Sequence, residues 1–417
     1  MENLVSNAQQ LQASLTNSNV LPQMQEALAQ FTKLGTPNKK NEAWKYTNIT
    51  PLLQKNTSLE KVAASTIDVT KYILNKRAQI IFVDGNYCAS QTQLPAGVQV
   101  QLAEDYLLQL DPQDALELYN LAVSDKTLVI TVAKNTSIRE PITLLHLQTA
   151  ELAGKMLNPR ILFRVNDHAQ VSFYESYRHL GKNNPSYTIN SLVEFSLAAG
   201  ARVEHIKAQI DSLEALHIGK VKAEVGKDAT FNSFTFSVGA SISRNNIHVQ
   251  LKETGAATTV HGLYALRDQQ LSDQYSIIDH GKEHTQSRQL FKGILDDAAH
   301  GVFCGKIIVH KDAQQITSTQ LNKNILLGKK AHINTRPILE IYADDVKCAH
   351  GATVGQIDPE QVFYLQSRGI SLPEAQKILC HGFAQETIDT IGHQEIRDEL
   401  SRLLITKYER YREIENA

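Results

Sequence analysis

The segment N-D-H-A-Q-V-S-F, which starts at Asn166, decides the fold because its turn recurs along the chain. Similar turns read A-G-A-R-V-E from Ala199, K-D-A-T-F from Lys227 and T-G-A-A-T-T-V from Thr254. Their central alanines, at positions 169, 201, 229 and 257, are 32, 28 and 28 residues apart. Such intervals are typical of one coil of a β-solenoid, whose stacked coils bury a continuous core. A β-sandwich also needs many short strands, but it does not require a small residue at one recurring turn. The pattern therefore predicts a parallel β-helix.

Three regions follow from the distribution of strand and helix signals. Strand-like runs succeed one another from Thr127 for over 200 residues, and helix signals return only at the end of the chain. We predict a mostly helical N-terminal region (1–125), a β-helix core (126–357) and a C-terminal helical domain (358–417). The fold class is thus mainly β, with helical regions on both sides of the β-helix.

Composition excludes several classes of function. The 417 residues carry a formal net charge of −2, so a general electrostatic attraction to nucleic acid is not expected. Four cysteines, none in a C-x-x-C pair, are too few for a disulfide framework and favour a reducing compartment. The sequence has neither a signal-peptide pattern at its start nor a run of about 20 apolar residues. We therefore expect a cytoplasmic protein without membrane spans.

The stretch Pro337–Gly355 contains the best candidate for a metal site. Val346, Cys348 and His350 alternate with other residues on a predicted strand, so the thiol and the imidazole share one face. These side chains are good ligands for soft metals, but two ligands do not complete a tetrahedral site. Either a second polypeptide supplies the others, or the pair has no ligand role. Cys380-His381 is a further candidate on a predicted helix.

The residues after Asp358 carry clear helix signals. Asp358 is a suitable N-cap before Pro359, and S-L-P-E from Ser371 is a capping box. A later helix has one apolar face, formed by Ile396, Leu400, Leu403, Leu404, Tyr408 and Tyr411. This face either packs on the protein's own core or binds a partner.

Other motifs leave the function open. The sequence has no P-loop motif, so it does not hydrolyse nucleotides in that way by itself. The cluster D-H-G-K-E-H-T-Q-S-R (279–288) is either catalytic or part of a ladder between coils. A polysaccharide-acting β-helix enzyme would use acidic pairs such as Asp296-Asp297 or Asp344-Asp345. Adjacent strand residues face opposite sides, however, which argues against either pair. A passive solenoid adaptor without metal chemistry is a third interpretation.

Several strings, in order and spacing, resemble the SufB/SufD family of iron–sulfur cluster assembly scaffolds. The strings are H-T-Q-S-R-Q-L-F-K-G-I-L (284–295), G-V-F-C-G-K-I-I-V (301–309), S-T-Q-L-N-K-N-I-L-L (318–327), P-I-L-E-I-Y-A-D-D-V-K-C-A-H-G-A-T-V-G (337–355) and F-Y-L-Q-S-R-G-I (363–370). With E-A-W-K-Y-T (42–47), they are more similar to the SufD branch than to the SufB branch. The resemblance is strong over roughly residues 280–385 and weaker before them. It is specific because several independent strings agree.

The resemblance implies a right-handed parallel β-helix between helical regions, in a non-catalytic scaffold subunit. It implies pairing with a SufB-like paralogue through the β-helix and binding of a SufC-like ABC ATPase through the C-terminal helices. It also allows a homodimer when the subunit is isolated. The implied cargo is a nascent iron–sulfur cluster, and the resemblance also implies that reduced FAD is associated with the assembled complex. His350 matches the family's proposed cluster ligand, and Cys348 matches the cysteine beside it. The family's usual string is C-S-H-G, whereas Ala349 stands here, with a side chain that should point away from the Cys/His face.

Overall fold

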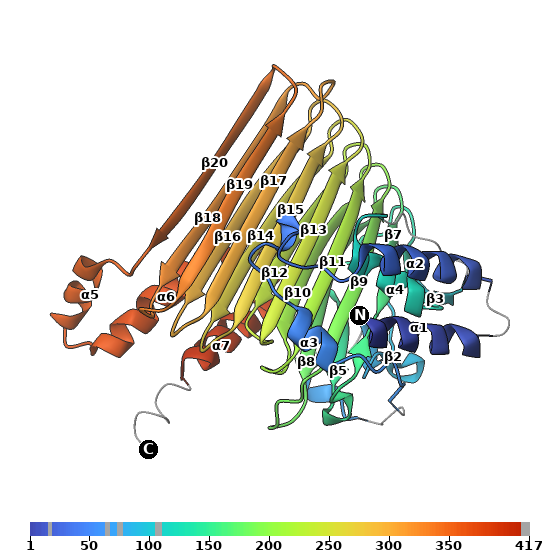
Figure 1. Ribbon diagram of the computed structural model, residues 1–417. Coiled ribbons are helices and arrows are strands. Elements are labelled where there is room, and N and C mark those ends of the chain that lie inside the picture. Colours follow the sequence, from blue (N-terminus) through green and yellow to red (C-terminus); the bar gives the residue numbers. More distant parts are fainter. Residues whose placement is uncertain (16–18, 63–66, 73–77, 105–110, 410–417) are drawn as a thin grey trace.

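Two long sheets form a β-helix in the computed structural model, which describes residues 1–15, 19–62, 67–72, 78–104 and 111–409 (Figure 1). Sheet 1 contains, in spatial order, β2 (Asn86–Tyr87), β1 (Gln79–Val83), β5 (Ile142–Gln148), β8 (Gln170–His179), β10 (Arg202–Ile210), β12 (Thr230–Ser237), β14 (Ala257–Leu266), β16 (Gln286–Leu295), β18 (Ile316–Leu326) and β20 (Val346–Gly355). Sheet 2 contains β19 (His332–Ile341), β17 (His300–Val309), β15 (Leu271–His280), β13 (Ile242–Leu251), β11 (Leu216–Val225), β9 (Thr188–Leu197), β7 (Arg160–Val165), β4 (Thr127–Val132) and β3 (Val98–Ala103), and β6 (Met156–Leu157) also pairs with β9.

From β7 on, the chain alternates between the two sheets, so neighbouring strands of one sheet are one coil apart in sequence. Neighbouring strands pair in parallel from β4 to β20, whereas the β1–β2 and β3–β4 pairs are antiparallel. The predicted parallel β-helix is therefore confirmed. Strands β1 to β3 come from the first 103 residues, so the N-terminal region also contributes strands to both sheets.

The recurring turn has a common backbone geometry, in which a left-handed residue precedes a buried small one. His168 (φ 56°), Gly200 (φ 65°) and Asp228 (φ 53°) precede the fully buried Ala169, Ala201 and Ala229. In the next coil Gly255 (φ 74°) precedes Ala256, which is fully buried. The expectation that Ala257 fills this position is wrong by one residue, because the glycine that permits the left-handed conformation fixes the register.

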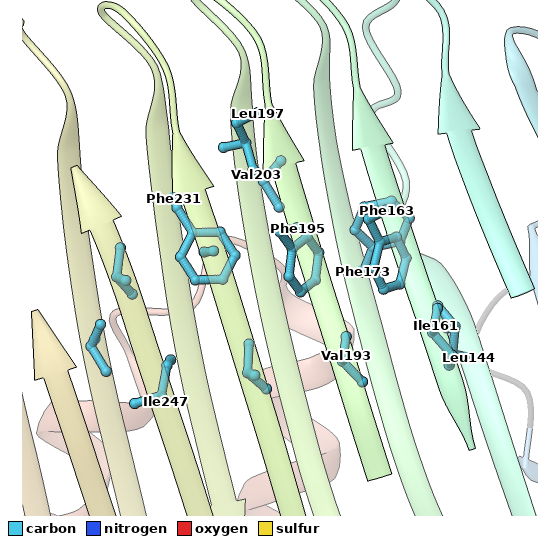
Figure 2. Packing of buried hydrophobic residues seen from close by; sticks show 14 of the residues in the cluster. Leu144, Ile161, Phe163, Phe173, Val193, Phe195, Leu197, Val203, Phe231 and Ile247 are labelled. Atoms are coloured by element: carbon cyan, nitrogen blue, oxygen red, sulfur yellow. The ribbon is translucent and has the colours of Figure 1, made fainter. Parts of the chain in front are cut away.

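The core is a stack of apolar side chains from the inward faces of both sheets. Phe163, Phe173, Phe195 and Phe231 pack along the axis, and the parallel rings of Phe163 and Phe195 have centroids 4.4 Å apart (Figure 2). Strand residues alternate between the two faces of a sheet, so every second residue of each strand faces the interior. The interior also contains many buried polar side chains, and some of them form a ladder that leads to the end of the β-helix.

Helices cover the outer face of each sheet. On sheet 2 the helices α1 (Glu2–Ser14), α2 (Leu21–Leu34), α3 (Thr50–Lys55) and α4 (Ala115–Val123) pack around Leu216 and Ile218 of β11. Short 3₁₀ turns occur at η1 (Glu42–Trp44), η2 (Thr70–Tyr72), η3 (Ala89–Gln91) and η4 (Ala150–Leu152). Trp44 lies 4.0 Å from the Arg244 guanidinium, so it anchors its segment on sheet 2.

At the C-terminus the helices are α5 (Pro359–Gln366), α6 (Leu372–Ile388) and α7 (Gln394–Glu409). Asp358 caps α5 through its contact with the Glu360 amide, at 2.9 Å, as predicted. Helix α6 begins at the predicted place, but the Ser371 hydroxyl donates to the Glu374 carboxylate instead of capping a backbone amide through its side chain.

The apolar face of α7 packs on the protein's own β-helix. Ile396, Leu400 and Leu404 are buried together with α6 residues against the outer face of sheet 1, including Phe236. Of the two predicted interpretations of this face, packing on the core is thus the one observed for these three residues. Tyr411 and the Tyr408 side chain lie outside the described part of the structure. Among the described residues, none of the helices is long and apolar enough to cross a bilayer.

A buried histidine inside the β-helix predicts acid lability. His280 is fully buried, with ring nitrogens 2.7 Å from the Thr285 hydroxyl and 2.9 Å from the Ser287 hydroxyl. Burial lowers its pKa from 6.5 to about 4. As the pH falls below 6.5, the unfolded chain takes up a proton that the folded chain still excludes, so stability decreases by up to about 3 kcal/mol toward pH 4.

We expect His280→Gln to reduce the loss of stability between pH 7 and pH 5, measured as the shift in the urea denaturation midpoint. The surface variant His332→Gln is the control, since His332 is exposed. An unchanged pH dependence in His280→Gln would contradict this assignment.

Candidate metal and partner site at the open end of the β-helix

The β-helix ends in two strands that each have one unpaired edge. β20 is the last strand of sheet 1 and pairs only with β18, and β19 is the last strand of sheet 2 and pairs only with β17. Most residues of β20 are exposed, and the inner residues of β19 are only half-buried. In Figure 1 both strands lie at the side of the molecule opposite the N-terminal helices. The described chain therefore leaves this end of the β-helix open.

Cys348 and His350 lie on the interior side of β20 at this open end. They pair in register with Ser318 and Gln320 of β18, both of which are fully buried inside the β-helix. Residues in register on neighbouring strands point to the same face, so the alternation in the sequence places both side chains inward. His350 is exposed at the end, whereas Cys348 is half-buried. Burial raises the pKa of the Cys348 thiol above its ordinary value.

The other candidate ligands are not brought to this end. Cys380 is buried in α6 on the outer face of sheet 1, and burial raises the pKa of its thiol to about 12. In the cluster 279–288, His280 is inside the β-helix whereas Asp279 pairs outside with His310, at 2.6 Å. This cluster is therefore part of the ladder between coils. Within the described ranges, no group of three or more His, Cys, Asp or Glu residues is placed to hold a metal ion.

The acidic pairs proposed for a polysaccharide enzyme lie at turns between strands. Asp297, the second residue after β16, has a left-handed backbone (φ 52°), and its amide donates to the Asp296 carboxylate at 2.8 Å. Asp344 and Asp345 lie in the turn between β19 and β20 and are exposed. Neither pair lines the clefts beside Trp44, Gly97 or Asn7, so these clefts give the interpretation no support.

Comparison with known proteins identifies the family. Residues 146–383 match the SufBD core domain of the SUF system for iron–sulfur cluster assembly, and residues 3–144 match the SufBD N-terminal region. The chain belongs to the SufBD family. It is 31% identical to an "Iron-sulfur cluster assembly SufBD family protein" of Synechocystis, with 92% of this chain and 90% of the relative covered. It is 30% identical to "Iron-sulfur cluster assembly protein SufD" of Escherichia coli, with 91% of each chain covered. It is 28% identical to "Protein ABCI7, chloroplastic" of Arabidopsis thaliana, with 93% of this chain and 86% of the relative covered.

A polar ladder inside this SufBD protein leads to the open end, and sequence reasoning missed it. The Ser287 and Ser318 hydroxyls are 2.6 Å apart, and Ser318 is the register neighbour of Cys348. Beside them, Gln289 and Gln320 are joined at 3.2 Å. The only signal was the string S-T-Q-L-N-K-N (318–324), which is polar at six of its seven positions. Such a pattern ordinarily marks a solvent-facing side, which is why it did not indicate an interior.

Farther from the open end, the interior holds a cluster of charged groups. The ring nitrogens of His146 and His205 lie 3.4 and 2.9 Å from the two oxygens of the fully buried Glu175. Burial opposes ionisation of Glu175, but the two imidazoles hold its pKa well below the ordinary value. The Lys207 ammonium occupies the place where a side chain at position 219 would lie, so Gly219 leaves room for it. These groups come from strands far from β20 and are not part of the candidate metal site.

Helix α5 is the most exposed element near the open end. It has no buried residue, and Phe363 and Tyr364 are 73% and 56% exposed. The helix begins four residues after β20 ends and projects away from the sheets in Figure 1. Two adjacent exposed aromatic side chains are typical of a protein interface.

Proposed function

We propose that this SufBD protein is a SufD-type, non-catalytic scaffold subunit. It pairs with a SufB-type paralogue and a SufC-type ABC ATPase to build and transfer nascent iron–sulfur clusters. The open end of the β-helix carries this proposal, since two strands with unpaired edges lie there and one of them, β20, carries Cys348 and His350. Free edge strands are suited to pairing with a strand of another chain. A paralogue bound at this end would bring its own ligands to the same place.

The donor set suits an iron–sulfur cluster as cargo. Imidazole nitrogen and cysteine thiolate both ligate iron, and two donors leave the remaining positions to a partner. His350 is exposed and accessible to a cluster at the interface. Cys348 is half-buried with a raised pKa, so its thiol would have to lose a proton when metal binds. His350 is therefore the principal ligand in this proposal, and Cys348 is the secondary one.

We also assign a role to each region of the chain. Residues 1–125 form the N-terminal region, residues 126–357 form the β-helix that meets the paralogue, and residues 358–417 form the domain that docks the ATPase. We further propose that the complex acts in the cytoplasm and that reduced FAD binds to the assembled complex. The same open edges would allow a homodimer when the subunit is isolated.

The exposed α5 supports docking of the ATPase. Its connection to β20 is short, so movement of docked ATPase subunits would pull on the strand that carries His350. The experiment that tests the proposed function is anaerobic purification of the tagged chain with its partners, followed by iron and sulfide analysis. We expect His350→Ala to lower the retained iron and sulfide at least about tenfold. Losing a partner that supports a metal ligand already lowers metal affinity about tenfold or more, and losing the ligand itself should lower it at least as much.

The matched control is His332→Ala, an exposed histidine on the neighbouring edge strand. Normal cluster content in His350→Ala would refute the ligand role. Purification of an iron-free chain without an ABC ATPase or a paralogue would support the passive adaptor instead.

A further inference from the structure

One column of side chains inside sheet 1 leads directly to His350. Residues Gln289 of β16, Gln320 of β18 and His350 of β20 are paired in register, each one coil from the next. The two glutamines are fully buried, and His350 is the last member at the open end. Neighbouring strands are about 4.8 Å apart, so side chains in register along such a column lie within reach of one another.

The two amides form a ladder that is incomplete at its outer end. The Ser276 hydroxyl donates to Gln289 Oε1 at 2.9 Å, and Gln320 Nε2 donates to the same oxygen at 3.2 Å. Gln320 Oε1 is buried and has no hydrogen-bond partner. A buried acceptor without a partner destabilises the folded chain, so a donor that reaches Gln320 Oε1 would stabilise it.

The opposite wall holds the Gln320 amide in place. Gly305 of β17 faces it, and a β-carbon at position 305 would collide with Gln320 Nε2. Phe303 and Gln289 also adjoin the amide. The amide is therefore confined in a fitted space, with one end bonded toward the interior and the other end unpaired.

We propose that Gln320 is a positioning residue for His350. Its Oε1 accepts a hydrogen bond from one ring N–H of His350, which leaves the second ring nitrogen unprotonated and directed to the interface. A histidine ligand commonly donates its other N–H to a fixed oxygen, which sets the tautomer and the orientation of the ring. The buried acceptor that is unpaired in the isolated chain is thus paired when the ring is fixed at the closed interface. This inference rests on the proposed function, because it gives the ring a task only if His350 ligates the cluster.

The test uses two readouts on the wild type, Gln320→Leu, Gln320→Glu and His350→Ala. The first is the urea denaturation midpoint of the isolated chain. The second is pulsed electron paramagnetic resonance of the dithionite-reduced iron–sulfur cluster in the complete complex. The quadrupole frequencies of the remote imidazole nitrogen in that spectrum depend on the hydrogen bond that its N–H donates.

We expect Gln320→Leu to unfold at the same or a higher urea concentration, because it removes an unpaired buried acceptor while the Ser276 hydroxyl still donates to Gln289 Oε1. The same variant should shift the remote-nitrogen frequencies and lower cluster retention about tenfold. Gln320→Glu restores an acceptor. The Gln289 amide can turn to meet it, since Gln289 Nε2 is unpaired. This variant should therefore recover cluster retention. If Gln320 acted only through its packing, an acceptor at this position would give no such recovery.

Two results would overturn the proposal and separate it from the proposed function. If His350→Ala abolishes the nitrogen signal but Gln320→Leu leaves its frequencies unchanged, the ligand role stands and the positioning role fails. If the wild type has no histidine nitrogen signal, or His350→Ala retains it, the ligand role of His350 and the positioning role of Gln320 both fail.

Discussion

Replacing both Phe363 and Tyr364 by alanine is expected to weaken binding of the ABC ATPase about a hundredfold or more, with little effect on the stability of the chain. Both aromatic side chains are mostly exposed, and no residue of α5 is buried in the described chain. Truncating an aromatic hot spot costs about 2 kcal/mol or more of binding free energy, and two such losses exceed a hundredfold in affinity. The stability should be unchanged because neither side chain packs in the core.

The measurement is the dissociation constant between the purified subunit and the ATPase, with urea denaturation as the check on folding. Leu102→Ala is the matched control, since Leu102 is 51% exposed on β3 and is distant from α5. Unchanged affinity in the double variant would refute the docking role of α5. Deletion of residues 358–417 is a poor substitute, because it would also uncover the apolar outer face of sheet 1, including Phe236.

Removal of the Glu399 carboxylate should destabilise the folded chain by about 3 kcal/mol. Glu399 of α7 pairs with Arg178 of β8, and both side chains are largely buried between the helix and sheet 1. Arg178 also donates to the Ser176 hydroxyl at 2.8 Å. In Glu399→Leu the guanidinium stays buried without its counter-charge, and breaking a buried pair in this way costs about 3–5 kcal/mol.

A double variant separates the pair from simple packing. Arg178→Met combined with Glu399→Leu removes both charges and should recover most of the lost stability, because an apolar pair of similar volume often replaces a buried ion pair without loss. Urea denaturation of the wild type, Arg178→Met, Glu399→Leu and the double variant gives a complete double-mutant cycle. Equal destabilisation in Glu399→Leu and in the double variant would show that the charge pair is not the cause.

Local sequence determined the fold class and the position of the candidate site. A small buried residue after a left-handed one recurs in successive coils, and this requirement is local enough to be visible at Ala169 and Ala201. The cap at Asp358 and the shared face of Cys348 and His350 follow from equally local rules. The error at Ala257 has the same origin, since two adjacent alanines differ only in which one follows the left-handed glycine.

Long-range packing decided what the sequence left open. The sequence could not show that Gln320 is buried, because a strand of mostly polar residues has the same sequence pattern whether its polar side chains face solvent or a hydrogen-bonded interior. It could not show that Glu175 meets His146 and His205, since these residues come from three different strands. Nor could it show that α7 covers its own β-helix while α5 stays exposed, because both helices carry apolar residues. The sequence by itself determined the β-helix, its helical ends and the Cys348/His350 pair. Only the tertiary structure decided which faces are covered and that the pair lies at an open end, because burial depends on contacts between residues far apart in the chain.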